Sequence, residues 1–196
     1  MFFRSERLFL RPGWPEDRDA LLRAIADEGI VTNLASAPWP FLARDAQDAA
    51  ARPQNPRFPH FFVTRPDRAA GSELVGSVGL GARADGSGVA PELGYWIARD
   101  HWGKGYATEA GRAVLTIART LGHRRVTASH FIDNPASGRV LAKLGFRPTG
   151  AIDQRRSRAR GASAAAVVHA IDLAAGGDYG GDGDGEGSAV AMPRAA

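Results

Sequence analysis

The sequence contains no cysteine among its 196 residues. Disulfides, a cysteine nucleophile and thiolate zinc sites are therefore excluded, and the composition fits a reducing compartment. No apolar run approaches the roughly 18 residues that a membrane-spanning helix needs. The first residues also lack the charged and then apolar stretches of a secretory signal. We therefore expect a cytoplasmic protein with no membrane segment.

Several binding motifs are missing as well. None of the five histidines has another histidine four positions away, so we expect no zinc site and no other metal. The glycines form neither the Gly-x-Gly-x-x-Gly pattern of a dinucleotide-binding fold nor the Gly-Lys-Ser/Thr ending of a P-loop. The chain has no aromatic-rich motif for single-stranded nucleic acid, so direct nucleic-acid binding is not expected.

Charge and glycine content divide the chain into two parts. It carries 25 basic and 21 acidic residues, for a formal net charge of +4. Residues 174–196 hold four of the acidic residues and one of the basic ones, so residues 1–173 carry +7. Residues 176–187 contain seven glycines in twelve positions and cannot bury enough apolar surface to fold. We expect one domain over 1–173, whose basic charge suits an anionic ligand, and a disordered Gly/Asp-rich tail over 174–196.

Hydrophobic patterning alternates between strand and helix along residues 1–173. Helices are predicted to begin at Pro15, to span 44–52 and 107–121, and to run from Pro135 to Gly145. Short apolar runs predict strands at 8–10, 61–64, 74–80, 92–97, 126–131, 146–152 and 164–173, with a turn at 67–71. Strands outnumber helices and form hairpins. This indicates an α/β fold of the α+β type, with a mixed, mainly antiparallel central sheet flanked by helices.

The segment between the strand at 92–97 and the helix at 107–121 is the most informative. It reads Trp102-Gly103-Lys104-Gly105-Tyr106-Ala107, so two glycines precede a helix N-terminus. Glycine allows a sharp turn and a close approach of the backbone to a ligand. The first amides of a helix have no intrahelical acceptor, and together with the helix dipole they favour an anion such as phosphate. Lys104 adds a positive charge beside them.

The spacing of this segment resembles the acyl-CoA loop of the GNAT (Gcn5-related N-acetyltransferase) superfamily. That pattern is Gln/Arg-x-x-Gly-x-Gly/Ala, with Val or Ile five residues before it. Ile97, Gly105 and Ala107 fall in register, while Trp102 stands in place of the Gln/Arg. Residues 5–12, 102–110 and 134–146 resemble, in this order along the chain, segments of the branch that contains the ribosomal-protein N-terminal acetyltransferases. The resemblance spans about residues 5–173 and implies the GNAT acyl-CoA N-acyltransferase fold.

The resemblance implies acetyl-CoA as cosubstrate, lying between two splayed strands with its diphosphate on the amides of 102–107. Asn134 would contact it, and the following helix would flank the thiol. A backbone amide near Ile97 would hold the developing oxyanion. The expected cosubstrate contacts are Trp96, Ile97, Ala98, Trp102, Gly103, Lys104, Gly105, Tyr106, Ala107, Asn134 and Ser137.

Two proton transfers accompany the implied reaction, in which an amine attacks the thioester directly in a ternary complex. Many relatives protonate the thiolate with a tyrosine on the second cofactor helix, but the corresponding residue here is Leu141. Ser137 is our candidate for the acid. Glu92 is our candidate for the base that deprotonates the amine, with a water relay as a possibility. His101, His130 and Asp133 are alternatives for the base.

We therefore predict an acetyl-CoA-dependent N-acetyltransferase whose acceptor is a primary amine, either a protein N-terminus or a small molecule. A ribosomal protein is one candidate partner, and both a monomer and a homodimer are left open. The alternative is a non-catalytic acyl-CoA-binding or RNA/ribosome-associated module. It would use the arginines expected in the loop between the last two strands: Arg155, Arg156, Arg158 and Arg160.

Overall fold

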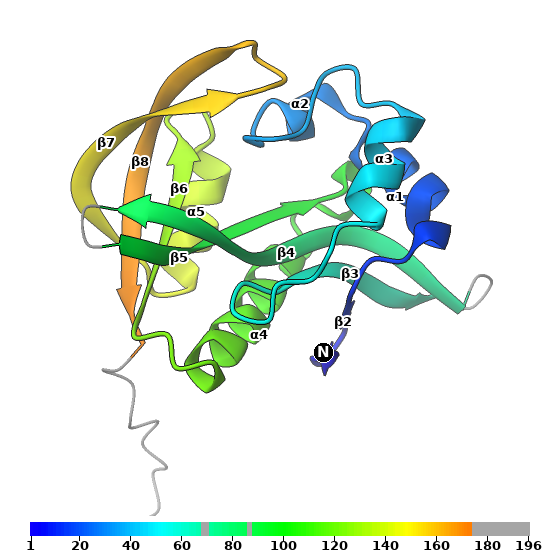
Figure 1. Cartoon of the computed structure of the whole chain (residues 1–196), viewed down its shortest axis with the longest axis horizontal. Coiled ribbons are helices and arrows are strands. Elements are labelled where there is room, and N and C mark those ends of the chain that lie inside the picture. Colours follow the sequence, from blue (N-terminus) through cyan, green and yellow to red (C-terminus); the bar gives the residue numbers. More distant parts are fainter. Residues whose placement is uncertain (68–70, 86–87, 174–196) are drawn as a thin grey trace, which may run out of the picture.

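The computed structural model of the chain describes residues 1–67, 71–85 and 88–173. Its centre is an eight-stranded sheet in the order β1-β2-β3-β4-β5-β6-β8-β7 (Figure 1). Neighbouring strands are antiparallel throughout, except that β5 and β6 run parallel. The strands are β1 (Phe3–Arg4), β2 (Phe9–Arg11), β3 (His60–Asp67), β4 (Gly71–Asp85), β5 (Gly88–Ile97), β6 (Arg125–Phe131), β7 (Arg147–Ser157) and β8 (Ala162–Asp172). The predicted mixed, mainly antiparallel sheet is confirmed.

Helices cover both faces of this sheet. On one face α4 (Tyr106–Thr120) and α5 (Pro135–Lys143) enclose a core with the buried residues of β2 to β6. On the other face α1 (Arg18–Ile25), α2 (Glu28–Val31) and α3 (Ala43–Ala50) form a second apolar cluster around Phe62 (Figure 1). Short 3-10 turns at Pro15–Asp17 and Arg99–His101 precede α1 and the loop before α4. No helix among the described residues is long and apolar enough to cross a membrane.

The helices α4 and α5 begin and end within two residues of where the sequence predicts. Gly105 and Gly122 bound α4 with φ angles of +80° and +79°, a left-handed conformation that glycine adopts without strain. Asn134 is the N-cap of α5, and Pro135 occupies its first turn. Both predicted helices are confirmed.

Some predicted boundaries differ from the structure. The strands predicted at 74–80 and 92–97 are the inner parts of a longer hairpin, in which β4 reaches Asp85 and β5 starts at Gly88. The glycines and Asp85 in this part of the sequence are typical of loops. In the structure, however, pairing between β4 and β5 provides hydrogen-bond partners for the backbone there. The placement of Arg155 and Arg156 in a loop was wrong, because both lie in β7. Part of the predicted turn, residues 68–70, and the predicted tail at 174–196 lie outside the described residues.

Gly76 of β4 lies where this strand approaches the end of β5 most closely. A Cβ atom there would collide with the Trp96 carbonyl and would lie 2.8 Å from Ile97 Cδ1. Gly94 of β5 differs, because a Cβ atom there would meet nothing within 4 Å. The chain thus offers two strand glycines with opposite steric surroundings.

We expect Gly76→Ala to lower the free energy of unfolding by about 1–3 kcal/mol, because the methyl group would push β5 away from β4. Gly94→Ala is the matched control and should leave stability unchanged or slightly higher. Urea unfolding of both variants measures the difference. Equal midpoints would contradict the close approach of the two strands.

Three histidines of the sheet sit in surroundings that favour the neutral imidazole. Burial, together with the positive charge of Arg52, lowers the pKa of His60 to about 4. Burial also lowers the pKa of His130, and burial together with the charge of His130 lowers that of His169. The centres of the His130 and His169 rings lie 5.0 Å apart. The unfolded chain therefore binds more protons than the folded chain in mildly acidic solution.

We expect acid to destabilise the fold through these groups. The contribution of neutral His60 to the free energy of unfolding is fully present above the pKa of about 6.5 that this residue has in the unfolded chain. As the pH falls towards 4 this contribution is lost, and the total loss is about 3 kcal/mol. His60→Gln should flatten the dependence of unfolding free energy on pH between 6.5 and 4. Identical slopes for the variant and the wild-type chain would show that His60 does not cause it.

Candidate active site

The sheet opens between its two parallel strands. β5 pairs with β4 along its whole length, but it meets β6 through one residue pair, Glu92 with Thr127. Both strands lie wholly within the described residues. Beyond Glu92 they diverge, and the gap joins a cleft of about 1440 Å³. The cleft reaches the start of α4, the start of α5 and the cluster around α1 to α3.

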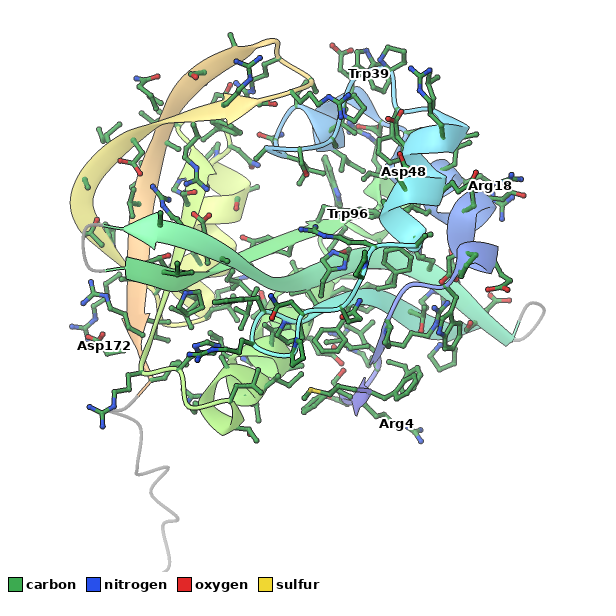
Figure 2. All side chains as sticks on the ribbon, in the orientation of Figure 1. Arg4, Arg18, Trp39, Asp48, Trp96 and Asp172 are labelled. Atoms are coloured by element: carbon green, nitrogen blue, oxygen red, sulfur yellow. The ribbon has the colours of Figure 1, made fainter. Side chains whose placement is uncertain are left out.

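The unpaired edge of β5 presents backbone groups to this gap. The Ala98 amide donates to the Val75 carbonyl at 2.9 Å, so Ala98 and Trp96 face β4. Alternation in an antiparallel pair turns the amide and carbonyl of Tyr95 and Ile97 the other way, towards the gap. Of the predicted contacts Trp96, Ile97 and Ala98, only Ile97 therefore offers backbone groups at this edge. Trp96 contributes its side chain to the opposite face of the sheet, where Asp48 also lies (Figure 2).

The loop before α4 carries free amides at the mouth of the gap. Gly103 and Gly105 both have positive φ angles, and Gly105 is an N-cap without a side-chain hydrogen bond. The first helical hydrogen bond runs from the Glu109 amide to the Gly105 carbonyl at 3.0 Å. Within the described ranges, no group accepts from the amides of residues 105–108. These amides and the exposed Lys104 make a positive site that can hold a phosphate group.

An N-terminal clasp holds this loop in position. The Arg7 amide and the Ser5 hydroxyl donate to Glu109 Oε1 at 2.8 and 2.7 Å, and Arg7 Nε donates to Oε2 at 2.8 Å. Arg7 also donates to the Lys104 carbonyl at 3.0 Å. Burial opposes the charge on Glu109, but the bonds from Arg7 and Ser5 prevail and lower its pKa. Arg7, whose charge is paired with Glu109, therefore holds the N-terminal segment against the loop, a contact that sequence reasoning missed.

Trp102 connects the loop to the edge of β5. Its indole Nε1 donates to the Ile97 carbonyl at 2.6 Å. The Arg99 guanidinium lies 4.6 Å from the centre of its ring and pairs with Asp27. The tryptophan thus braces the strand end, and a cation stacks on it.

Ser137 and Tyr95 meet on the α5 side of the gap. Asn134 Oδ1 accepts from the Ser137 amide at 3.3 Å, which positions the serine in the first turn of α5. Ser137 Oγ lies 2.8 Å from Tyr95 Oη, which also donates to the Ser137 carbonyl at 3.1 Å. Burial raises the pKa of Tyr95 to about 12, despite the opposing bond to Ser137, so the phenol keeps its proton. Leu141 is 1% exposed and belongs to the core.

Sequence reasoning missed Tyr95, although the alternation of residues along the strand indicates which face of the sheet its side chain occupies. Tyr95 shares its face of β5 with Leu93 and Ile97, which contribute to the buried core. That face is the one covered by α4 and α5.

Glu92 lies at the point where β5 and β6 part, and its carboxylate is fully engaged. Oε1 accepts from Arg83 at 2.9 Å, Arg155 at 2.8 Å and Ser129 at 3.2 Å. Oε2 accepts from Arg155 at 2.6 Å. The side chain, 17% exposed, links β4, β5, β6 and β7. This arrangement favours a structural bridge over a proton acceptor.

The alternative candidates for the base differ in whether their side chains already have hydrogen-bond or ion-pair partners. His101 Nε2 lies 3.0 Å from Glu73 Oε1, and Asp133 pairs with Arg160 at 2.7 Å. The hydrogen bond from Arg160 is the main cause of the lowered pKa of Asp133. His130 lines the cleft beside α5, and its buried Nδ1 has no partner among the described residues. Those residues also contain no group of three side chains that could hold a metal ion.

Comparisons with known proteins agree with this architecture. The model of the acetyltransferase (GNAT) domain family matches residues 7–147. The uncharacterized N-acetyltransferase YoaA of Bacillus subtilis is 31% identical over 156 residues, which cover 76% of this chain and 85% of YoaA. A GNAT-family acetyltransferase structure from Bacillus anthracis superposes with a TM-score of 0.73 at 22% identity, covering 89% of this chain and 99% of the other. RimL, a ribosomal L7/L12 α-N-protein acetyltransferase solved with coenzyme A, gives 0.69 at 18% identity, covering 88% and 98%. The chain has the GNAT fold and belongs to the GNAT family of acetyltransferases.

Proposed function

We propose that this chain transfers the acetyl group of acetyl-CoA to a primary amine by direct attack in a ternary complex. The observation that carries the proposal is the set of free helix amides at residues 105–108, which open onto the unpaired edge of β5. A diphosphate at these amides and a pantetheine arm along the strand edge would use both features at once. RimL, which has the same fold, was solved with coenzyme A.

The backbone and the loop divide the binding of the cosubstrate between them. Lys104 and the free amides would balance the diphosphate charge, Arg7 would hold the loop through the Lys104 carbonyl, and Trp102 would keep the strand end in place through the Ile97 carbonyl. The Ile97 amide, which faces the gap, would donate to the oxygen of the thioester as negative charge develops on it. Holding both reactants in line supplies a large part of the rate enhancement.

The proton for the departing thiolate would come from Ser137. Its hydroxyl lies at the α5 side of the gap, in hydrogen-bond contact with the protonated Tyr95 phenol. The Tyr95 hydroxyl can turn its single proton from the Ser137 carbonyl to Ser137 Oγ while Ser137 donates to the sulfur, which makes the two residues one donor unit.

The amine would approach from the face of α1 to α3. Gly94 leaves open space on that face of β5, and Phe41, Phe62 and Trp96 line the same part of the cleft. Acceptors of two kinds fit the proposal, a protein N-terminus such as that of a ribosomal protein, or a small-molecule amine. Of the four arginines that the RNA-associated alternative would use, Arg155 is bound to Glu92 and Arg160 to Asp133, whereas Arg156 and Arg158 are exposed.

Replacing Gly105 should abolish binding of acetyl-CoA. In Gly105→Val a β-branched side chain would have to adopt a φ of +80° beside the free amides. Gly122→Val is the matched control, because Gly122 has a φ of +79° at the other end of α4. Calorimetry should detect no binding by the first variant and a dissociation constant within about threefold of wild type for the second. Absence of binding by the wild-type chain at millimolar acetyl-CoA would reject the proposal.

Ser137→Ala should reduce turnover by about 100-fold while the dissociation constant of acetyl-CoA changes less than about twofold. Thiol release with an alanyl tripeptide, spermidine and kanamycin as amines measures turnover. Tyr95→Phe should add little to the loss in the double variant, because the two hydroxyls act as a unit. Ser163→Ala, at an exposed position of β8, is the control. Unchanged turnover in Ser137→Ala would remove this residue from the reaction.

A further inference from the structure

A histidine–serine pair lies on the acceptor face of the sheet, away from the cosubstrate loop. His60 opens β3, Ser77 lies in β4, and His60 Nε2 is 2.7 Å from Ser77 Oγ. Both residues line the cleft. Ser77 is 2% exposed, whereas His60 as a whole residue is half-buried.

The strand register places this pair opposite open backbone. His60 pairs with Gly79 in β4, which in turn pairs with Gly94 in β5. A Cβ atom on Gly79 would lie 2.7 Å from His60 Cα, so this glycine lets β3 come close. At about 4.8 Å per strand, His60 and Gly94 are about 10 Å apart at their Cα atoms. Because the paired residues of β4 and β5 are Gly79 and Gly94, neither strand places a side chain between His60 and the backbone of Gly94.

The hydrogen bond between His60 Nε2 and Ser77 Oγ can form with either tautomer of the ring, and a proton acceptor at Nδ1 requires the one in which Nε2 carries the proton. Burial and the charge of Arg52 lower the pKa of His60 to about 4, so the imidazole is neutral near pH 7. A neutral imidazole has one donor and one acceptor nitrogen. When Nε2–H donates to Ser77 Oγ, the lone pair is left on Nδ1. Nδ1 has no hydrogen-bond partner among the described residues and is not one of the enclosed polar atoms.

We propose that His60 Nδ1 accepts the proton that the attacking amine loses, and that Ser77 is a positioning residue that orients the ring. The inference rests on the proposed amine acetylation. It assigns the base to the acceptor face, in place of the fully engaged Glu92.

The amine lone pair forms the C–N bond at the acetyl carbonyl carbon, the C–S bond breaks, and its electron pair leaves with sulfur. One N–H bond breaks, its electrons remain on the nitrogen of the new amide, and the proton moves to Nδ1. The sulfur takes the proton of Ser137. Ser137 then regains a proton from water, and His60 releases its own proton to water.

A weakly basic imidazole suffices for this transfer. The amine enters in its neutral form, and its nitrogen becomes far more acidic once it is bonded to the carbonyl carbon. The proton therefore has to be accepted late, when even a weak base can hold it. Remaining unprotonated near pH 7 keeps His60 ready for each turnover.

The test compares His60→Gln, His60→Ala and Ser77→Ala with Thr64→Val. Thr64 is a matched control, because it is a buried hydroxyl of β3 that bonds to the Phe9 carbonyl at 3.1 Å and does not line the cleft. Thiol release is measured with whichever of alanyl tripeptide, spermidine and kanamycin the wild-type chain acetylates fastest. Circular dichroism and the dissociation constant of acetyl-CoA are measured on each folded variant.

We expect His60→Gln to lower kcat by about 100-fold or more, with the dissociation constant of acetyl-CoA within about twofold of wild type. Ser77→Ala should lose about tenfold in kcat, and added imidazole should raise the rate of His60→Ala. A purely structural pair would give no response to imidazole.

Three results would overturn the inference. The first is a kcat of His60→Gln within about threefold of wild type. The second is an equal loss in Thr64→Val, and the third is no effect of imidazole on His60→Ala. If the wild-type chain releases no thiol with any of the amines, the proposed function itself fails, and this assignment fails with it.

Discussion

The separation of β5 from β6 after a single residue pair is the constraint on which the site depends. Strands in a sheet normally satisfy each other's backbone groups, so a partly unpaired strand in the middle needs support. Here Glu92 supplies it at the branch point, because its carboxylate binds Arg83 and Arg155 from two other strands. Ion pairs of this kind add little stability relative to apolar packing. Their contribution is geometric, since they hold four strands together at the place where two of them part.

The alternation of β5 then sorts the chemistry onto two faces. Tyr95 lies on the side of α4 and α5, where it meets Ser137, whereas Gly94 and Trp96 lie on the side of α1 to α3. The backbone of Ile97 runs between the two faces and points into the gap. In the proposed reaction, this strand would support the proton donor Ser137 on one face, leave open space for the incoming amine on the other, and present an amide between them.

Local features of the site could be predicted from the sequence, whereas long-range pairings could not. The glycines around α4 and the Asn134–Pro135 start of α5 act within a few residues, and the structure has both helices as predicted. Glu92 was predicted as a base because its position on a strand is readable. Its partners Arg83 and Arg155 are 9 and 63 residues away, and only the register of the sheet brings them to it. The His60–Ser77 contact depends on register in the same way.

The location of the phenol shows how one chemical requirement can be met from a different element. The position at which relatives have a tyrosine on the second cofactor helix is Leu141 here, and it packs in the core where a hydroxyl would lack a partner. Tyr95 brings the phenol from β5 instead, to the first turn of the same helix. Because β5 also supplies the Ile97 amide, the phenol that bonds to the proposed donor Ser137 and the proposed oxyanion donor belong to one strand. Strand geometry determines the spacing of Tyr95 and Ile97. The contact between Tyr95 and Ser137 then fixes the first turn of α5 relative to that strand.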